Sequence, residues 1–276
     1  MSVLFNGRAS GSGPLLLAIE REMAGRHGAV VVLDVRTGRL VACPDRERAA
    51  LRHARPGSSV KPFTLLALLE SGEVTERTRL VCGRNLRVGG RRLDCTHPDD
   101  QAPLDAATAL AFSCNWFFTQ AVRRLSPDGL LRSLQRSGLG ARTGLAEPEA
   151  SGVIRRAGSL EQLQLQAVGE SSIEVTPLGL AVAYKRLAGE CARNPALRDG
   201  LIGCVRYGTG QLAGRGSLPV AGKTGTATSR SGAFTHGWFA GFTEEIVVVV
   251  FLEHGQGALD AAPVAGAVFE AYKRAG

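Results

Sequence analysis

The sequence predicts a protein of the α/β (α+β) class, with a mainly antiparallel five-stranded sheet, flanking helices and an inserted all-helical subdomain. Two groups of strand-like segments, one near each end of the chain, support this prediction. The stretch between them, roughly residues 60–210, carries helical patterns that glycines and prolines interrupt. Strands at both ends of a helical middle are typical of one sheet that both termini build.

The N-terminal part supplies one helix and two strands. Residues 1–13, which are rich in glycine and serine, predict a flexible tail. Residues 15–24 (LLLAIEREMA) have apolar side chains at helical spacing with charges between them. Residues 29–35 (AVVVLDV) and 36–43 (RTGRLVAC) predict two strands, joined by a Thr-Gly turn.

The remaining elements follow in order along residues 14–276, which we expect to form one domain with the helical subdomain inside it. A chain of 276 residues is long enough to bury a substantial core. Apolar periodicity predicts helices at residues 60–72, 104–112, 115–125, 128–138 and 176–189, strands at 220–228, 236–242 and 246–253, and a closing helix at 262–275.

The composition is that of an ordinary globular protein, with 44% hydrophobic and 21% charged residues. The net charge is +8, but the densest basic stretch, residues 83–93, contains no aromatic residue that could stack on bases. We therefore expect no nucleic-acid partner. The longest apolar runs, residues 15–19 and 246–252, fall short of the roughly 18 residues that a spanning helix needs. The N-terminus shows no signal peptide either.

Lysine is rare in this chain, and the residues next to two of its lysines point to a functional role. Lysine and arginine together number 33, of which only four are lysine. Arginine cannot lose its proton in a protein, whereas lysine can. A lysine retained in an arginine-rich background is therefore a candidate for work that needs deprotonation or a compact charge. Lys61 and Lys223 are the two candidates that their neighbours support.

Ser58 and Lys61 stand three residues apart at a predicted helix start, in the stretch PGSSVKPF. This spacing places both side chains on one helical face. A serine hydroxyl becomes a good nucleophile when a neighbouring base takes its proton, and lysine can be that base if its pKa is lowered by several units. Taken alone, the pair is also explained by a capping serine and a surface lysine.

Two further stretches favour the nucleophile–base interpretation of Ser58 and Lys61. AFSCNWFF places Ser113 and Asn115 in a tight loop between helical segments, where a simple helix cap is the other explanation. VAGKTGTAT places Lys223, Thr224 and Gly225 in a strand, where a β-bulge with an exposed lysine is the other explanation.

The ordered set Ser-x-x-Lys, Ser-x-Asn and Lys-Thr-Gly resembles that of the penicillin-recognising serine acyltransferases, namely penicillin-binding proteins and serine β-lactamases. Flanking segments such as LDVRTGRLVA, TPLGLAVAYKRLA, YGTG and HGWFAGF are similar to those of transpeptidase domains of large penicillin-binding proteins. The resemblance covers the chain from about residue 14 to its end.

The resemblance implies a role for each motif residue. Ser58 would be the acylated nucleophile with Lys61 as its base, Ser113 would relay a proton, and Asn115 would orient Lys61 and bind the substrate. Lys223, Thr224, Gly225 and Thr226 would form the substrate-binding strand, whose cation and hydroxyls hold a carboxylate. The backbone N–H groups of Ser58 and Thr226 would form the oxyanion hole.

The implied activity is that of a peptidoglycan D,D-transpeptidase acting on D-Ala-D-Ala stem peptides through an acyl-enzyme. A serine β-lactamase, a D,D-carboxypeptidase and a non-catalytic penicillin sensor or scaffold remain the alternatives. Expected partners are stem peptides, β-lactams and cell-wall synthesis or division proteins. The expected location is extracytoplasmic. This location conflicts with the sequence, in which neither an export signal nor a membrane anchor is visible. The chain also departs from the family at Glu170-Ser171, where Gln-Gly is usual.

Cys82 and Cys95 bracket a Gly- and Arg-rich loop and can pair in an oxidising compartment. His97 lies nearby, but the spacing C-x12-C-x-H is poor for zinc ligands. We therefore favour structural cysteines or one disulfide over a metal, and expect no cofactor.

Overall fold

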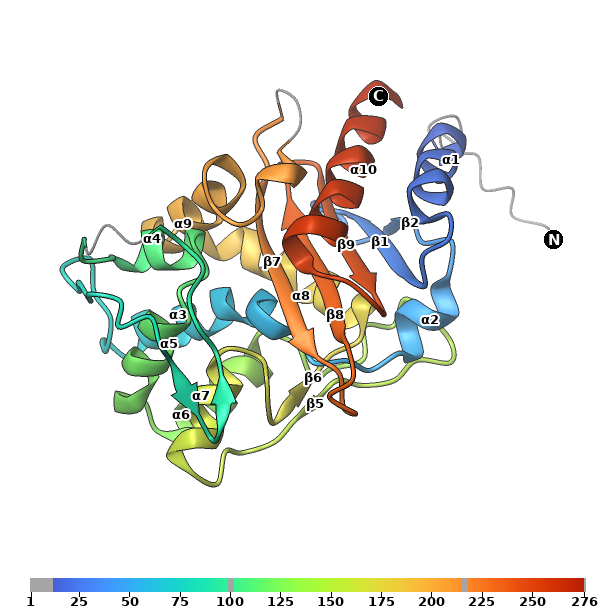
Figure 1. Ribbon diagram of the computed structural model, residues 1–276. Coiled ribbons are helices and arrows are strands. Elements are labelled where there is room, and N and C mark those ends of the chain that lie inside the picture. The colour runs from blue at the N-terminus through green and yellow to red at the C-terminus, as the bar shows by residue number, and fades with distance from the viewer. Residues whose placement is uncertain (1–11, 99–101, 215–217, 276) are drawn as a thin grey trace.

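A single five-stranded antiparallel sheet organises the protein (Figure 1). The structure, a computed structural model, describes residues 12–98, 102–214 and 218–275. Its strand order is β2-β1-β9-β8-β7, so the N-terminal pair completes a sheet that the C-terminal strands begin. The predicted fold class is confirmed. The strands are β1 (Gly28–Asp34), β2 (Leu40–Ala42), β7 (Ala221–Thr228), β8 (Thr235–Phe242) and β9 (Ile246–Leu252).

Both faces of the sheet are covered, which explains why its middle strand, β9, is apolar throughout. Successive side chains of a strand point to opposite faces. Val31 and Val249 accordingly belong to the core on the side of α8 (Pro177–Glu190), while Val30 and Val250 pack on the other side. There α1 (Ser12–Met23) and α10 (Ala262–Ala275) lie against each other.

The middle of the chain is the predicted helical insert, although it is not purely helical. Two small two-stranded sheets interrupt it, and their two-residue strands leave no alternating pattern for the sequence to display. They are β3 (Arg87–Val88) with β4 (Arg91–Arg92), and β5 (Val153–Ile154) with β6 (Ile173–Glu174). The helices of this part are α2 (Arg46–Leu51), α3 (Lys61–Glu70), α4 (Ala106–Ala111), α5 (Asn115–Ala121), α6 (Pro127–Arg136), α7 (Leu160–Ala167), α8 and α9 (Pro195–Arg206).

Three of these helices, α2, α7 and α9, are not among the predicted elements. The first two are short, and glycines interrupt the apolar pattern of α9. The predicted tail at residues 1–13 lies outside the described residues up to residue 11, whereas Ser12 and Gly13 already belong to α1. Among the described residues, no helix is both long and apolar enough to cross a membrane.

Candidate active site

Ser58 lies in a tight 3-10 turn, Gly57–Val60, directly before α3. This turn has about three residues per revolution, so Ser58 and Lys61 lie nearly above one another. Ser58 is half-buried, whereas Ser59 is fully buried and its hydroxyl donates to the carbonyl of Pro56 at 2.7 Å. The structure therefore leaves Ser58, and not Ser59, as the available hydroxyl.

Close backbone packing holds this turn against β7. Gly57 has φ +52°, and a Cβ added there would lie 2.6 Å from the carbonyl oxygen of Thr226. A Cβ on Gly225 would lie 2.5 Å from the carbonyl oxygen of Pro56. The glycine of Lys-Thr-Gly therefore marks the close backbone approach that glycine in a strand often indicates. From the other side, the Tyr184 hydroxyl donates to the carbonyl of Ser59 at 2.8 Å.

Lys61 connects the first two motifs through three hydrogen bonds. Its Nζ lies 2.6 Å from the carbonyl oxygen of Ser113, 2.6 Å from Oδ1 of Asn115 and 3.2 Å from Oγ of Ser113. A neutral amine has only two N–H donors and one lone pair. In the neutral form, Nζ can keep the two short bonds and turn its lone pair toward a hydroxyl. The geometry is thus compatible with a base.

The electrostatic surroundings of Lys61 favour its neutral form. Its side chain is 0% exposed, and this burial is the main reason that its pKa falls to about 7. The positive charge of Lys223 lowers the pKa further. Both effects disfavour the ammonium, by removing water and by repulsion respectively.

Ser113 lies in the predicted tight inter-helix loop, and Asn115 is the first residue of α5. Ser113 has φ +57°, a left-handed conformation that non-glycine residues rarely adopt, at the step from α4 to α5. The Asn115 side chain accepts from Lys61 and donates through Nδ2 to the carbonyl of Leu93 at 3.0 Å. These two hydrogen bonds fix the orientation of the Asn115 amide beside Lys61.

The third motif lies on β7, which is an edge of the sheet. Lys223 is 0% exposed, burial lowers its pKa, and its Nζ donates to the carbonyl of Thr224 at 3.1 Å. The hydroxyl of Thr224 pairs with that of Thr209 at 2.6 Å. Thr226 is the exposed member of the group, and its Oγ1 accepts from the N–H of Gly257. The fold thus brings all three predicted motifs to one place.

Comparison with known proteins decides the family. The profile of the family described as "Penicillin binding protein transpeptidase domain" matches residues 28–196 and 193–272. The chain belongs to this family. It is 22% identical to the peptidoglycan D,D-transpeptidase MrdA of Acinetobacter baumannii, over 93% of this chain and 52% of that protein. The chain therefore spans about half the length of this curated relative.

Solved penicillin-binding proteins share the fold. PBP2 of Pseudomonas aeruginosa, determined in complex with WCK 5153, superposes with a TM-score of 0.83 at 22% identity, covering 94% of this chain and 76% of that one. PBP2 of Helicobacter pylori, determined in complex with MreC, gives a TM-score of 0.83 at 19% identity, covering 95% and 63%. At identities of 22% and 19%, this similarity shows a common fold only.

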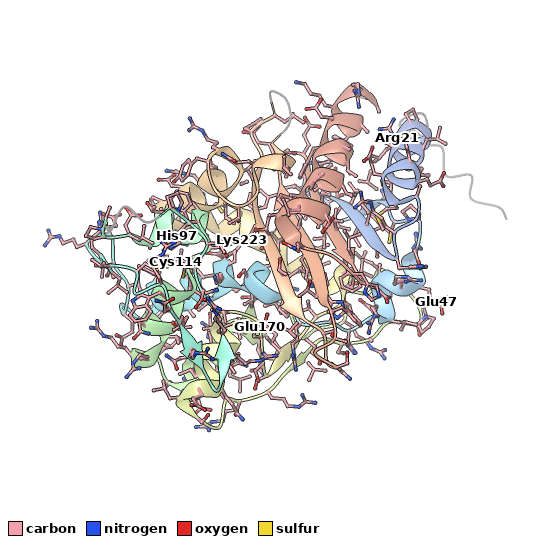
Figure 2. The ribbon with its side chains drawn as sticks, in the orientation of Figure 1. Arg21, Glu47, His97, Cys114, Glu170 and Lys223 are labelled. Atoms are coloured by element: carbon pink, nitrogen blue, oxygen red, sulfur yellow. The ribbon has the colours of Figure 1, made fainter. Side chains whose placement is uncertain are left out.

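Glu170, which the sequence resemblance marks as a departure, lies between α7 and β6 and beside β7 (Figure 2). Its carboxylate accepts from Nη1 of Arg91 at 3.1 Å and from the N–H of Thr228 at 3.3 Å. Burial raises its pKa, although Arg91 opposes the shift. The sequence marks Glu170 as a departure but does not point to Arg91, because a basic residue in an arginine-rich hairpin gives no local signal.

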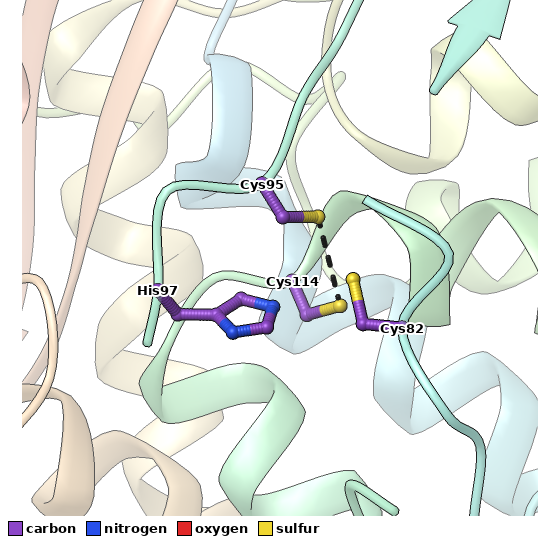
Figure 3. Close-up of side chains that lie close together, drawn as sticks. All are labelled: Cys82, Cys95, His97 and Cys114. Atoms are coloured by element: carbon purple, nitrogen blue, oxygen red, sulfur yellow. Dashed lines mark hydrogen bonds between the residues drawn. The ribbon is translucent and has the colours of Figure 1, made fainter. Parts of the chain in front are cut away.

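Four possible metal ligands cluster beside the Ser113–Asn115 loop of this penicillin-binding domain (Figure 3). The ligand atoms of Cys82, Cys95, His97 and Cys114 all lie within 4.8 Å of one another. The sulfurs of Cys95 and Cys114 are 3.8 Å apart, and a hydrogen bond from Cys114 lowers the pKa of Cys95 to about 5. That separation is far beyond a disulfide bond of about 2.05 Å. The sequence points to three of these residues, but it does not mark Cys114 as a ligand.

The donor set and its geometry fit a tetrahedral zinc ion. With Zn–S bonds of about 2.3 Å, two sulfurs of a tetrahedron are roughly 3.8 Å apart. Nδ1 of His97 lies 2.9 Å from the carbonyl of Pro98, while its Nε2 is buried without a hydrogen-bond partner among the described residues. An imidazole that donates through one nitrogen leaves the other for a metal. Of the two expected alternatives, structural cysteines or one disulfide, the structure shows no disulfide, since Cys82 and Cys95 are both free thiols.

A cavity of roughly 860 Å³ lies elsewhere. It is lined by residues such as Val35, Ile202 and Phe242, and by none of the motif residues. This cavity is therefore separate from the place where the three motifs meet.

Proposed function

We propose that the chain is the catalytic domain of a peptidoglycan D,D-transpeptidase, which is acylated at Ser58 by D-Ala-D-Ala stem peptides and by penicillins. The observation that carries this proposal is Lys61, a fully buried lysine with a pKa of about 7 that is hydrogen-bonded to both Ser113 and Asn115. A surface lysine would have neither this burial nor this set of partners. We take the domain to span residues 14–276.

Acylation would begin when neutral Lys61 takes the proton of Ser58 as its oxygen attacks the carbonyl of the penultimate D-alanine. The N–H groups of Ser58 and Thr226 would stabilise the oxyanion, because the turn Gly57–Val60, which carries Ser58, packs directly on β7. The bond to the terminal D-alanine then breaks. Ser113, within reach of Lys61 at 3.2 Å, would pass the proton to the departing amine.

Substrate recognition would use β7 as a template. The stem peptide would add to its free edge as an extra strand. The terminal carboxylate would bind the hydroxyls of Thr224 and Thr226, with the buried Lys223 supplying positive charge from behind the strand. Transfer of the acyl group to an amine of a neighbouring stem completes a cross-link, and transfer to water gives carboxypeptidase activity.

We also propose that Cys82, Cys95, His97 and Cys114 hold a structural zinc ion. The buried Nε2 of His97 and the 3.8 Å separation of two sulfurs support it. A closed four-ligand site of this kind contributes folding energy and leaves no open position for catalysis. Because Cys114 lies between Ser113 and Asn115, its ligation would anchor the loop that holds Lys61.

The location and partners follow from the substrate. Stem peptides lie outside the cytoplasmic membrane, so we propose an extracytoplasmic place of action. The Helicobacter pylori relative was captured with MreC. A cell-wall synthesis protein of that kind is the partner class that we propose here.

A fluorescent penicillin followed by intact-mass measurement tests the proposal. One adduct is expected on the wild-type chain and none on Ser58→Ala, whereas Ser59→Ala, the matched control, keeps the adduct. Labelling that persists in Ser58→Ala, or that maps to Ser59, would contradict the assignment. Absence of any adduct on folded wild-type protein would favour the non-catalytic scaffold.

A further inference from the structure

Glu170 engages a backbone amide on the edge strand of the sheet. Its Oε1 accepts the N–H of Thr228, and its Oε2 accepts from Nη1 of Arg91. The same Arg91 nitrogen donates to the carbonyl of Glu170 at 2.9 Å, and the N–H of Glu170 donates to Leu165 at 2.8 Å. Backbone and carboxylate are thus both held, with the residue 7% exposed.

The backbone N–H of Thr228 points toward the edge of β7 at which a substrate strand would add. In the part of the chain that the structure describes, β7 pairs only with β8 and is the edge strand of the sheet. The N–H of Thr228 reaches Glu170, so it points away from β8. Residues two apart in a strand direct their backbone groups the same way. The N–H of Thr226 therefore also faces outward, where the oxyanion hole of the proposed function needs it.

An added antiparallel strand would use these outward amides in turn. If the carbonyl of the acylated D-alanine is bound at Thr226, the ladder places the second residue upstream of that D-alanine opposite Thr228. Its carbonyl would need the N–H of Thr228 as a donor. Glu170 already occupies that N–H, and displacing it would leave a buried carboxylate short of one partner.

We propose that Glu170 is a specificity-determining residue, which ends strand pairing between β7 and the acyl donor at Thr226 by occupying the amide of Thr228. This inference rests on the proposed function. The enzyme would bind only the last two residues of the donor along β7. A backbone carbonyl further upstream would not increase kcat/KM. A glutamine at this position could accept the same hydrogen bond through its carbonyl oxygen, so the occupied amide and not the charge is the determinant.

Two thioester donors isolate the hydrogen bond in question. Acetyl-D-alanyl thioester lacks the upstream carbonyl, and acetyl-glycyl-D-alanyl thioester supplies it as its acetyl group. With both donors, Ser58 Oγ forms an ester as the C–S bond breaks, and the serine proton leaves on the released thiol. Thiol release gives kcat and KM for each donor, and their kcat/KM ratio, long over short, is the quantity compared.

Glu170→Ala should raise this ratio about twofold to tenfold over wild type, the range expected for one net hydrogen bond. Glu170→Asp keeps a charge for Arg91 but is too short to span to Thr228, so the ratio should rise as well. Glu170→Gln should stay within about twofold of wild type, because its carbonyl still accepts. Glu161→Ala, at an exposed glutamate of α7, is the matched control and should leave the ratio unchanged.

A ratio in Glu170→Ala and Glu170→Asp equal to that of wild type would overturn the inference, and so would a rise in Glu170→Gln as large as in Glu170→Ala. A second readout is independent of turnover: hydrogen exchange of the Thr228 amide should be faster in the alanine variant and unchanged in the glutamine variant. If wild-type protein reacts with neither thioester nor penicillin, the proposed function fails instead.

Discussion

The acylation rate should follow the protonation state of Lys61, because only the neutral amine can accept the Ser58 proton. Burial and the charge of Lys223 lower the pKa of this lysine to about 7. The sign follows directly: below that pH the ammonium predominates and acylation slows, and above it the amine predominates and the rate levels off. We expect a profile that rises with pH and has its midpoint near 7.

The size of the effect follows from the shift. At pH 7 a lysine with the ordinary pKa of 10.5 would be neutral in roughly one molecule in 3,000, whereas a pKa of about 7 makes about half of the molecules neutral. The environment therefore raises the amount of available base roughly a thousandfold. Between about pH 5.5 and pH 7, the neutral fraction should rise roughly fifteenfold.

The assay is the second-order rate of labelling by fluorescent penicillin across this pH range, with circular dichroism at each pH as the control for folding. Lys223→Met removes the neighbouring positive charge, so its midpoint should move to higher pH, whatever happens to the rate itself. Lys223→Arg keeps the charge and should keep the midpoint. A flat wild-type profile, or one still rising steeply above about pH 9, would refute the base role of Lys61.

Three further outcomes are expected. Lys61→Arg should acylate almost as poorly as Lys61→Ala, since arginine cannot become a neutral base; a rate within about tenfold of wild type, or roughly 1.4 kcal/mol of barrier, would contradict this. The penicilloyl-enzyme should persist for minutes or longer, and chromogenic cephalosporin turnover above about one per second would instead indicate a β-lactamase. Protein purified without chelator should contain about one zinc ion per chain. Cys95→Ser should lose the zinc and lower the thermal midpoint, while Cys43→Ser, outside the cluster, should do neither.

The sheet and the three motifs could be predicted from the sequence because their signals are local. Continuous valine runs predict strands buried on both faces, and Val30 and Val31 do pack on opposite sides of β1. The Ser58–Lys61 spacing survives even though the turn is a 3-10 turn before the helix and not the first turn of α3 itself. In both geometries, residues three apart share a face.

Features that depend on distant contacts could not be predicted in the same way. The role of Arg91 emerges only when the β3–β4 hairpin folds over residue 170, which is 79 positions away. The direction of the Thr228 amide likewise depends on which strand becomes the sheet edge. Neither the Arg91 contact nor the direction of this amide produces a periodic or compositional pattern in the sequence. The sequence therefore identifies Glu170 as unusual but does not predict what it binds.

Cys114 shows how a local reading can miss a function that the fold assembles. In sequence it is the middle residue of Ser-x-Asn, where its thiol caps α5 by accepting the N–H of Phe117. The spacing of Cys82, Cys95 and His97 is poor for zinc when these three residues of one loop are taken as the only ligands. The fold adds Cys114 as the fourth and joins the proposed metal site to the loop around Lys61. The rigidity that a closed four-ligand site provides would therefore act where the proposed base is held.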